Sequence, residues 1–159
     1  MRRLVAAAFF TLASAGWCAA EKAMRKPLRL DGVWTLVLDP GNRGISEGWG
    51  ERGFPADCRR VQVRVPSPWE RYVPGYHGVA FYETEFNLPK GAGPRLQLHV
   101  GAANYHADGW LNGTPIGTHD GGYTPFAWDA TKAARPGGKN RLVIRIVHSP
   151  PGEDIEGTN

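Results

Sequence analysis

The sequence predicts an all-β protein folded as a β-sandwich. Its 159 residues include 21 Gly and 13 Pro, which is high for a helical protein and ordinary for short strands joined by turns. Several short segments alternate apolar and polar residues, and turn signals separate them by roughly 8–12 residues. A hydrophobic content of 42% with 21% charged residues fits a globular chain, and the length allows one domain with a proper core.

The first expected strand covers residues 30–39, because Trp34, Leu36 and Leu38 recur at every second position and share one face. A long Gly-rich loop follows over residues 40–57. Aromatic side chains prefer the interior, so we expect the aromatic residues of this loop to be buried against the fold rather than presented to a ligand.

Residues 61–65 form the next expected strand, with valines on one face, and Pro66 ends it. In residues 80–89, Tyr82 lies on the apolar face and Glu83 on the opposite face, which we expect to be exposed. The remaining expected strands are residues 95–100 and 141–147, each with apolar side chains at alternate positions.

Residues 109–131 carry the strongest local signals. Asn112-Gly113 between two extended segments predicts a tight hairpin, because a type I′ turn needs positive φ at both central residues. Gly121-Gly122 mark a second turn, and Asp129 suits a turn closed by its own side chain.

The order and spacing of this stretch, GWLNGTPIGTHDGGYTPFAWDAT, resemble the N-terminal sugar-binding domain of glycoside hydrolase family 2, the β-galactosidase and β-glucuronidase family. The Asp-Gly-x-Trp pattern at Asp31, the Val-Pro-x-x-Trp segment at Val65 and the Tyr-x-x-x-Phe-x-x-Pro pattern at Tyr82 extend the resemblance. It implies a jelly-roll β-sandwich, galactose-binding-domain-like, over residues 28–148. The motif residues assigned a structural role are Trp69, Asn112, Gly113, Gly121, Gly122, Phe126 and Asp129.

The resemblance also implies parts that this chain lacks. In the family, a further strand completes the sandwich, and an immunoglobulin-like domain and a (β/α)₈ catalytic barrel follow it. Residues 149–159 are interpreted as a loop toward that missing last strand, so we expect the chain to be a fragment or the product of a truncated gene. A missing strand exposes a sheet edge and part of the core, so the chain on its own is expected to be marginally stable or prone to aggregate.

Residues 1–20 have the features of a signal peptide: basic Arg2 and Arg3, a short apolar segment and small residues near its end. The protein is therefore expected to be exported, to the periplasm or the medium, with residues 21–27 as a flexible lead-in. Lipidation at Cys18 is the alternative, disfavoured because Trp17 is a poor residue before a modified cysteine.

Several classes of chemistry are not expected. The resemblance implies that both catalytic glutamates lie in the barrel, so no catalytic residue is assigned in this chain. The five histidines show no metal-ligand spacing, and after signal cleavage only Cys58 remains, so neither a metal, a cofactor nor an internal disulfide is expected. No cluster of Lys and Arg interleaves with aromatic residues, which disfavours nucleic acid as a partner.

Sugar binding remains open, because aromatic faces and fixed polar groups are what carbohydrate sites use. The candidate substrate-binding residues are Tyr82, Glu83, His119, Asp120 and Tyr123, with Tyr76, His77 and Trp110 as further candidates. For residues 119–126 a structural turn is the favoured interpretation.

Two functions follow. The first is a non-catalytic N-terminal sugar-binding and scaffold domain of an exported β-glycosidase, with a β-glycoside and the parent's immunoglobulin-like and barrel domains as partners. The alternative is a free-standing secreted carbohydrate-binding module.

Overall fold

Eight β-strands and two short helices make up the described part of the chain. The computed structural model describes residues 27–148, so the predicted signal peptide, nearly all of the lead-in and the predicted loop 149–159 lie outside it. The strands are β1 (Gly32–Asp39), β2 (Arg60–Val65), β3 (Gly78–Asn87), β4 (Gln97–Val100), β5 (His106–Leu111), β6 (Thr114–Asp120), β7 (Phe126–Asp129) and β8 (Lys139–His148). The helices are α1 (Trp49–Arg52) and the 3₁₀ helix η1 (Trp69–Arg71).

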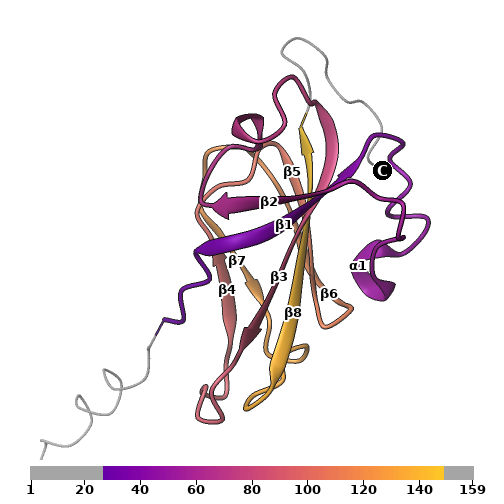
Figure 1. Ribbon diagram of the computed structural model, residues 1–159. Coiled ribbons are helices and arrows are strands. Elements are labelled where there is room, and N and C mark those ends of the chain that lie inside the picture. Colours follow the sequence, from indigo (N-terminus) through magenta and orange to yellow (C-terminus); the bar gives the residue numbers. More distant parts are fainter. Residues whose placement is uncertain (1–26, 149–159) are drawn as a thin grey trace, which may run out of the picture.

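The strands form two antiparallel sheets. Six strands pair in the order β2-β1-β3-β8-β5-β6, and β4 pairs with β7. Figure 1 shows β4 and β7 as a separate pair on one side of the long strands β3 and β8, with α1 on the other side. The fold is an all-β jelly-roll sandwich, as the sequence predicts, and each expected strand is present within a few residues of its expected bounds.

The central strands of the large sheet are buried on both faces. Its inner face, which includes Leu36 and Ile144, packs against β4 and β7 in one hydrophobic cluster. Its outer face, which includes Phe81, is covered by the loop that carries α1. Trp49 of that loop is 1% exposed and its ring lies 5.3 Å from the ring of Phe81. The aromatic residues of the loop are therefore packed against the fold, as expected.

Two facing glycines allow the sheets to approach each other. Gly109 of β5 pairs with Gly117 of β6, and a Cβ at either position would lie 2.3 Å from the indole of Trp128. Trp128 projects from β7 and donates through Nε1 to the carbonyl of Thr118 at 3.1 Å. The two glycines thus leave room for the indole of Trp128, the largest side chain that β7 contributes to the core.

The Asn112-Gly113 hairpin is tied to the rest of the fold by side-chain amides. Both residues have positive φ, 54° and 82°, as a type I′ turn requires. Asn112 Nδ2 donates to Oδ1 of Asn140 at 2.8 Å, and Asn112 Oδ1 accepts from the backbone of Arg141 at 3.0 Å. Asn140 is fully buried and donates to the carbonyls of Arg135 and Gly138. The predicted hairpin is confirmed.

The hairpin of β5 and β6 is long. Asp108 lies inside β5, and β6 continues through His119 to Asp120. The turn that follows is confined to residues 121–125. The reason is the long pairing of β5 with β6, which extends the hairpin as far as the His106–Asp120 pair.

Substituting Gly109→Ala is expected to lower the free energy of unfolding by about 1–3 kcal/mol, since the new methyl group overpacks the core against Trp128. The matched control is Gly101→Ala, where a Cβ would meet nothing within 4 Å. Urea unfolding followed by tryptophan fluorescence measures both variants. Equal midpoints for the two variants would mean that the contact with Trp128 does not require a glycine at position 109.

Candidate functional site

The residues predicted to bind sugar do not converge on one place. Tyr82 and Glu83 are neighbours in β3, and Tyr82 packs with the inner core while Glu83 pairs with Arg141 on the outer side. His119 stacks on Phe126 at 3.9 Å, whereas Asp120 turns to His106. Successive strand residues point to opposite faces, so each predicted pair is divided between the two sides of the sheet.

Tyr82 belongs to an aromatic cluster around Trp69 of η1. The two rings are stacked at 6.4 Å, and Tyr76 and His148 approach Trp69 edge-on, both at 5.7 Å. Trp69 is 4% exposed. Burial, with smaller contributions from Glu70 and Tyr72, raises the pKa of Tyr82 to about 12. Tyr82 is therefore a neutral, half-buried side chain that packs against the indole.

Glu83 contacts the layer that covers the outer face. Its carboxylate accepts from Arg141 Nε, and Arg141 also donates to the carbonyl of Gly50 at 3.0 Å. The same guanidinium lies over the ring of Phe54, 5.4 Å from its centroid. Glu83 was expected on an exposed face, but its side chain is 25% exposed because the loop carrying α1 lies over it. It fastens that loop to the sheet.

A chain of hydrogen-bonded polar side chains crosses the outer face of β5, β6 and β8. His106 lies between two carboxylates, with Nδ1 2.7 Å from Asp120 and Nε2 3.0 Å from Asp108. The second oxygen of Asp108 accepts from Arg145 at 2.8 Å, and Arg145 also donates to Asn42 Oδ1 at 2.9 Å. Arg145 is 5% exposed. We call these residues the His106 network. Sequence reasoning missed it because its members come from four separate segments.

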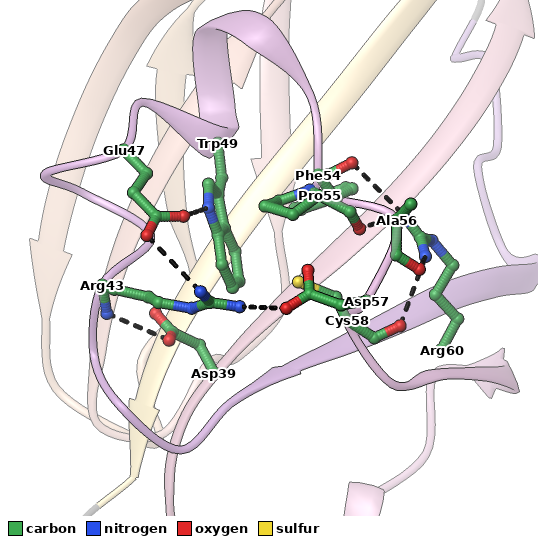
Figure 2. A network of polar contacts seen from close by, with 10 residues as sticks. All are labelled: Asp39, Arg43, Glu47, Trp49, Phe54, Pro55, Ala56, Asp57, Cys58 and Arg60. Atoms are coloured by element: carbon green, nitrogen blue, oxygen red, sulfur yellow. Dashed lines mark hydrogen bonds and ion pairs between the residues drawn. The ribbon is translucent and has the colours of Figure 1, made fainter.

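A second polar network holds the long loop between β1 and β2 (Figure 2). The buried carboxylate of Asp39 accepts from the backbone amides of Arg43 and Gly44 at 3.0 and 2.8 Å. The Arg43 guanidinium bonds Asp57 at 3.1 Å and lies over the ring of Trp49. Its hydrogen bond to Asp57 lowers the pKa of that carboxyl.

Arg60 closes the same loop from β2 (Figure 2). Its guanidinium donates to four backbone carbonyls, those of Phe54, Pro55, Ala56 and Cys58. Burial raises the pKa of the Cys58 thiol, which favours the unreactive protonated form. The donors and acceptors of this network satisfy one another, so it is suited to shaping the loop.

Histidines gather at one end of the sandwich, which we call the histidine end: His77, His106, His119 and His148. His148 pairs with the first residue of β3, and His106 pairs with Val147. The rings of His77 and His148 are stacked at 5.5 Å. Sequence reasoning treated the histidines as scattered, since strand pairing was needed to bring them together. Within residues 27–148, no group of three His, Cys, Asp or Glu residues has an arrangement that could hold a metal ion.

In the same described segment, no helix has both the length and the apolar character needed to cross a membrane.

No protein-family model matches the chain. Among curated proteins, the β-glucuronidase of Paenibacillus borealis is 33% identical over 123 residues, which cover 74% of this chain and 20% of that protein. The β-glucuronidase of the dog, Canis lupus familiaris, is 30% identical over 160 residues, covering 87% of this chain and 24% of the dog protein. The chain thus spans a fifth to a quarter of the length of these relatives.

Solved structures of a β-glucuronidase also match this chain, again over about a fifth of the enzyme. The β-glucuronidase of Ruminococcus gnavus in complex with C6-substituted uronic isofagomine matches with a TM-score of 0.68 and 33% identity, over 75% of this chain and 21% of that chain. The same enzyme in complex with D-glucuronic acid matches with a TM-score of 0.64 and 30% identity, again over 75% of this chain and 21% of that chain.

The pKa of Tyr82 predicts an alkaline loss of stability. The folded state holds this proton up to about pH 12, whereas the ordinary pKa of a tyrosine is 10.0. The stabilisation is therefore fully present below pH 10 and is lost as pH rises from 10 to about 12. The variant Tyr82→Phe should lose less stability over that interval than the original chain. Urea midpoints from pH 9 to 12 measure it, with Tyr123→Phe, at an 89% exposed side chain, as the control. Parallel curves for all three proteins would contradict the assignment.

Because Arg145 is the cation of the His106 network, we expect the stability of the fold to depend strongly on it. Substituting Arg145→Met leaves the half-buried Asp108 carboxylate without its cation and should lower the free energy of unfolding by about 3 kcal/mol. The control is Lys139→Met, also in β8, whose ion pair with Glu85 is exposed (side chains 66% and 51%) and should contribute less than about 1 kcal/mol. Chemical denaturation compares them. Similar losses in both variants would mean that the network adds nothing beyond a surface pair.

Proposed function

Because this chain matches the N-terminal region of a family 2 glycoside hydrolase, with β-glucuronidases as its relatives, we propose that it is the non-catalytic scaffold region of a β-glycosidase. The observation that carries the proposal is the extent of the match. About three quarters of this chain aligns with β-glucuronidases in sequence and in fold, yet the aligned part is only about a fifth of the bacterial enzymes. Most of such an enzyme lies outside the matched region.

The described carboxylates support a non-catalytic role. Retaining hydrolysis of a glycoside needs two carboxyl groups about 5–5.5 Å apart with the sugar between them. Asp108 and Asp120 do converge, but the imidazole of His106 fills the space between them. Glu47 and Asp57 likewise converge on the guanidinium of Arg43. In both cases a cationic or hydrogen-bonding side chain occupies the place where a sugar would have to lie.

The substrate class we propose for the parent enzyme is a β-glucuronide. The curated relatives carry the name β-glucuronidase, and the similar solved structures hold uronic acid derivatives. Export is part of the proposal as well, and rests on the signal-peptide features of residues 1–20.

The structure suits a scaffold. A large sheet buried on both faces resists bending, since close-packed interiors deform little. The loop between β1 and β2 is also held, through Arg43, Arg60 and Arg141. Such a body can hold neighbouring parts of an enzyme in fixed positions.

The test is a chimera in which this chain replaces the matched N-terminal region of the Ruminococcus gnavus β-glucuronidase. We expect the chimera to hydrolyse an aryl β-D-glucuronide, and the same enzyme with the region simply deleted to be inactive. The isolated chain should show no hydrolysis. Turnover by the isolated chain would contradict the non-catalytic role.

A titration of the isolated chain with D-glucuronic acid, followed by NMR, distinguishes the proposed function from the alternative of a free-standing carbohydrate-binding module. Saturable shifts at the isolated chain, together with an inactive chimera, would favour a free-standing carbohydrate-binding module.

A further inference from the structure

His106, the first residue of β5, contacts a carboxylate with each of its two ring nitrogens. Nδ1 lies 2.7 Å from Oδ1 of Asp120, and Nε2 lies 3.0 Å from Oδ1 of Asp108. An ionised carboxylate only accepts hydrogen bonds, and a neutral imidazole carries a single N–H. A neutral ring would therefore turn a lone pair toward one of the two carboxylates, whereas a doubly protonated ring donates to both.

The balance of charge in the His106 network favours the doubly protonated ring as well. The network contains two carboxylates, and Arg145 is their permanent cation. A positive charge on the ring balances the second carboxylate, and a neutral ring leaves one carboxylate without a counter-charge. We propose that His106 is a proton-dependent clasp, which holds the end of β6 through Asp120 while the ring is doubly protonated and releases Asp120 when the ring loses a proton. The inference uses contacts within this chain alone and does not depend on the proposed function.

The contact with Asp120 is the one that a neutral ring gives up. Asp108 is held from a second side, because its Oδ2 accepts from Arg145 at 2.8 Å, and its side chain is 13% exposed. A half-buried carboxylate that loses a donor is destabilised, so the remaining N–H stays on Nε2, toward Asp108. The side chain of Asp120 is 65% exposed, so water can replace the ring there at little cost.

The charged groups that face the ring within residues 27–148 come from three strands. β5 provides Asp108, β6 provides Asp120, and β8 provides Arg145 through its bond to Asp108. The loop after β1 adds a neutral amide, that of Asn42, which accepts from Arg145. The residue of β8 opposite His106 is the apolar Val147.

The neighbouring histidines contact other partners. His119 stacks on Phe126 and, as the residue next to Asp120 in β6, points to the opposite face of the strand. His148 stacks with His77, and its Nε2 lies 3.6 Å from a carboxylate oxygen of Glu70. The response of Asp120 to protons is therefore assigned to His106.

Release of Asp120 acts on the turn over residues 121–125. The amide of Gly121 donates to the carbonyl of Tyr105 at 2.9 Å, directly after the residue that the clasp holds. At the other end of the turn, Phe126 is held by its stacking with His119. The pairing of β5 with β8 does not involve the ring, so the change is a local opening of the turn and the sandwich stays folded.

The direction of the response follows from the form of the ring that makes both contacts. Histidine changes its charge between about pH 5 and 8. The doubly protonated form holds Asp120, so the clasp is closed at the acid end of this interval and opens as the pH rises. The order of the turn should therefore be greatest at low pH.

The experiment is NMR of the chain from about pH 5 to 8, the interval in which histidine titrates. The nitrogen shifts of the His106 ring report how many protons it carries, and hydrogen exchange reports the protection of the Gly121 amide. We expect both ring nitrogens to be protonated at the acid end, and the protection of Gly121 to fall several-fold as the ring loses a proton. The amide of Asn112, which donates to the carbonyl of Arg141 at the hairpin end, should keep its protection.

The variant Asp120→Asn separates the clasp from a general effect of pH. The new amide can accept from a protonated Nδ1 and donate to an unprotonated one, so the contact should survive over the whole interval. Protection of Gly121 in this variant should stay constant. The matched control is Asp129→Asn at the end of β7, where the carboxylate accepts from the backbone amide of Thr131. This control should respond to pH as the original chain does.

Three results would overturn the clasp. The first is constant protection of Gly121 in the original chain, and the second is a fall of equal size in Asp120→Asn. The third is a ring that carries one proton throughout while both contacts persist, because the second proton would then lie on a carboxylate. If Asp120→Asn does not fold, the ring shifts and the protection of Gly121 in the original chain still decide between these results and the clasp.

Discussion

The burial of both faces of the central strands of the six-stranded sheet is the constraint on which the rest of the structure depends. Along β3 and β8, successive residues enter the inner and the outer cluster in turn, so Phe81 and Ala80 are both fully buried on opposite sides. The small sheet β4-β7 covers one face only. The loop between β1 and β2 must therefore serve as the second layer. Irregular backbone in that position needs fixed partners, and the arginines that bond its carbonyls and carboxylates supply them.

The same constraint explains why acidic side chains of the outer face are engaged. Where a sheet face is half covered, a carboxylate is partly desolvated and stable only beside a cation or a donor. Glu83 has Arg141, and Asp108 has both Arg145 and His106. These acids therefore link the outer layer to the sheet, Glu83 through Arg141 and Asp108 through Arg145, which also bonds Asn42.

Much of the fold could be predicted from the sequence because the relevant signals are local. Alternation identified the strands, and Asn112-Gly113 identified the hairpin. The candidate site could be predicted less well from the sequence. The alternation of residues 80–89 places Tyr82 and Glu83 on opposite faces, but no local pattern shows that the loop between β1 and β2 covers Glu83. The His106 network joins four segments that only the pairing of β5, β6 and β8 brings together, and no local pattern encodes that pairing.

The two ends of the sandwich are built from different chemistry, and this difference bears on what each end can bind. At the hairpin end, neutral amides make the contacts, since Asn112 bonds both Asn140 and the backbone of Arg141. At the histidine end, Tyr105 and Tyr123 are exposed, and Asp120, which lies 2.7 Å from His106 Nδ1, is still largely in water. Covering that end would remove water from the carboxylate, which is unfavourable unless new donors reach it. A partner that only supplied apolar surface would therefore bind poorly, and one that also carries a donor for Asp120 would be selected.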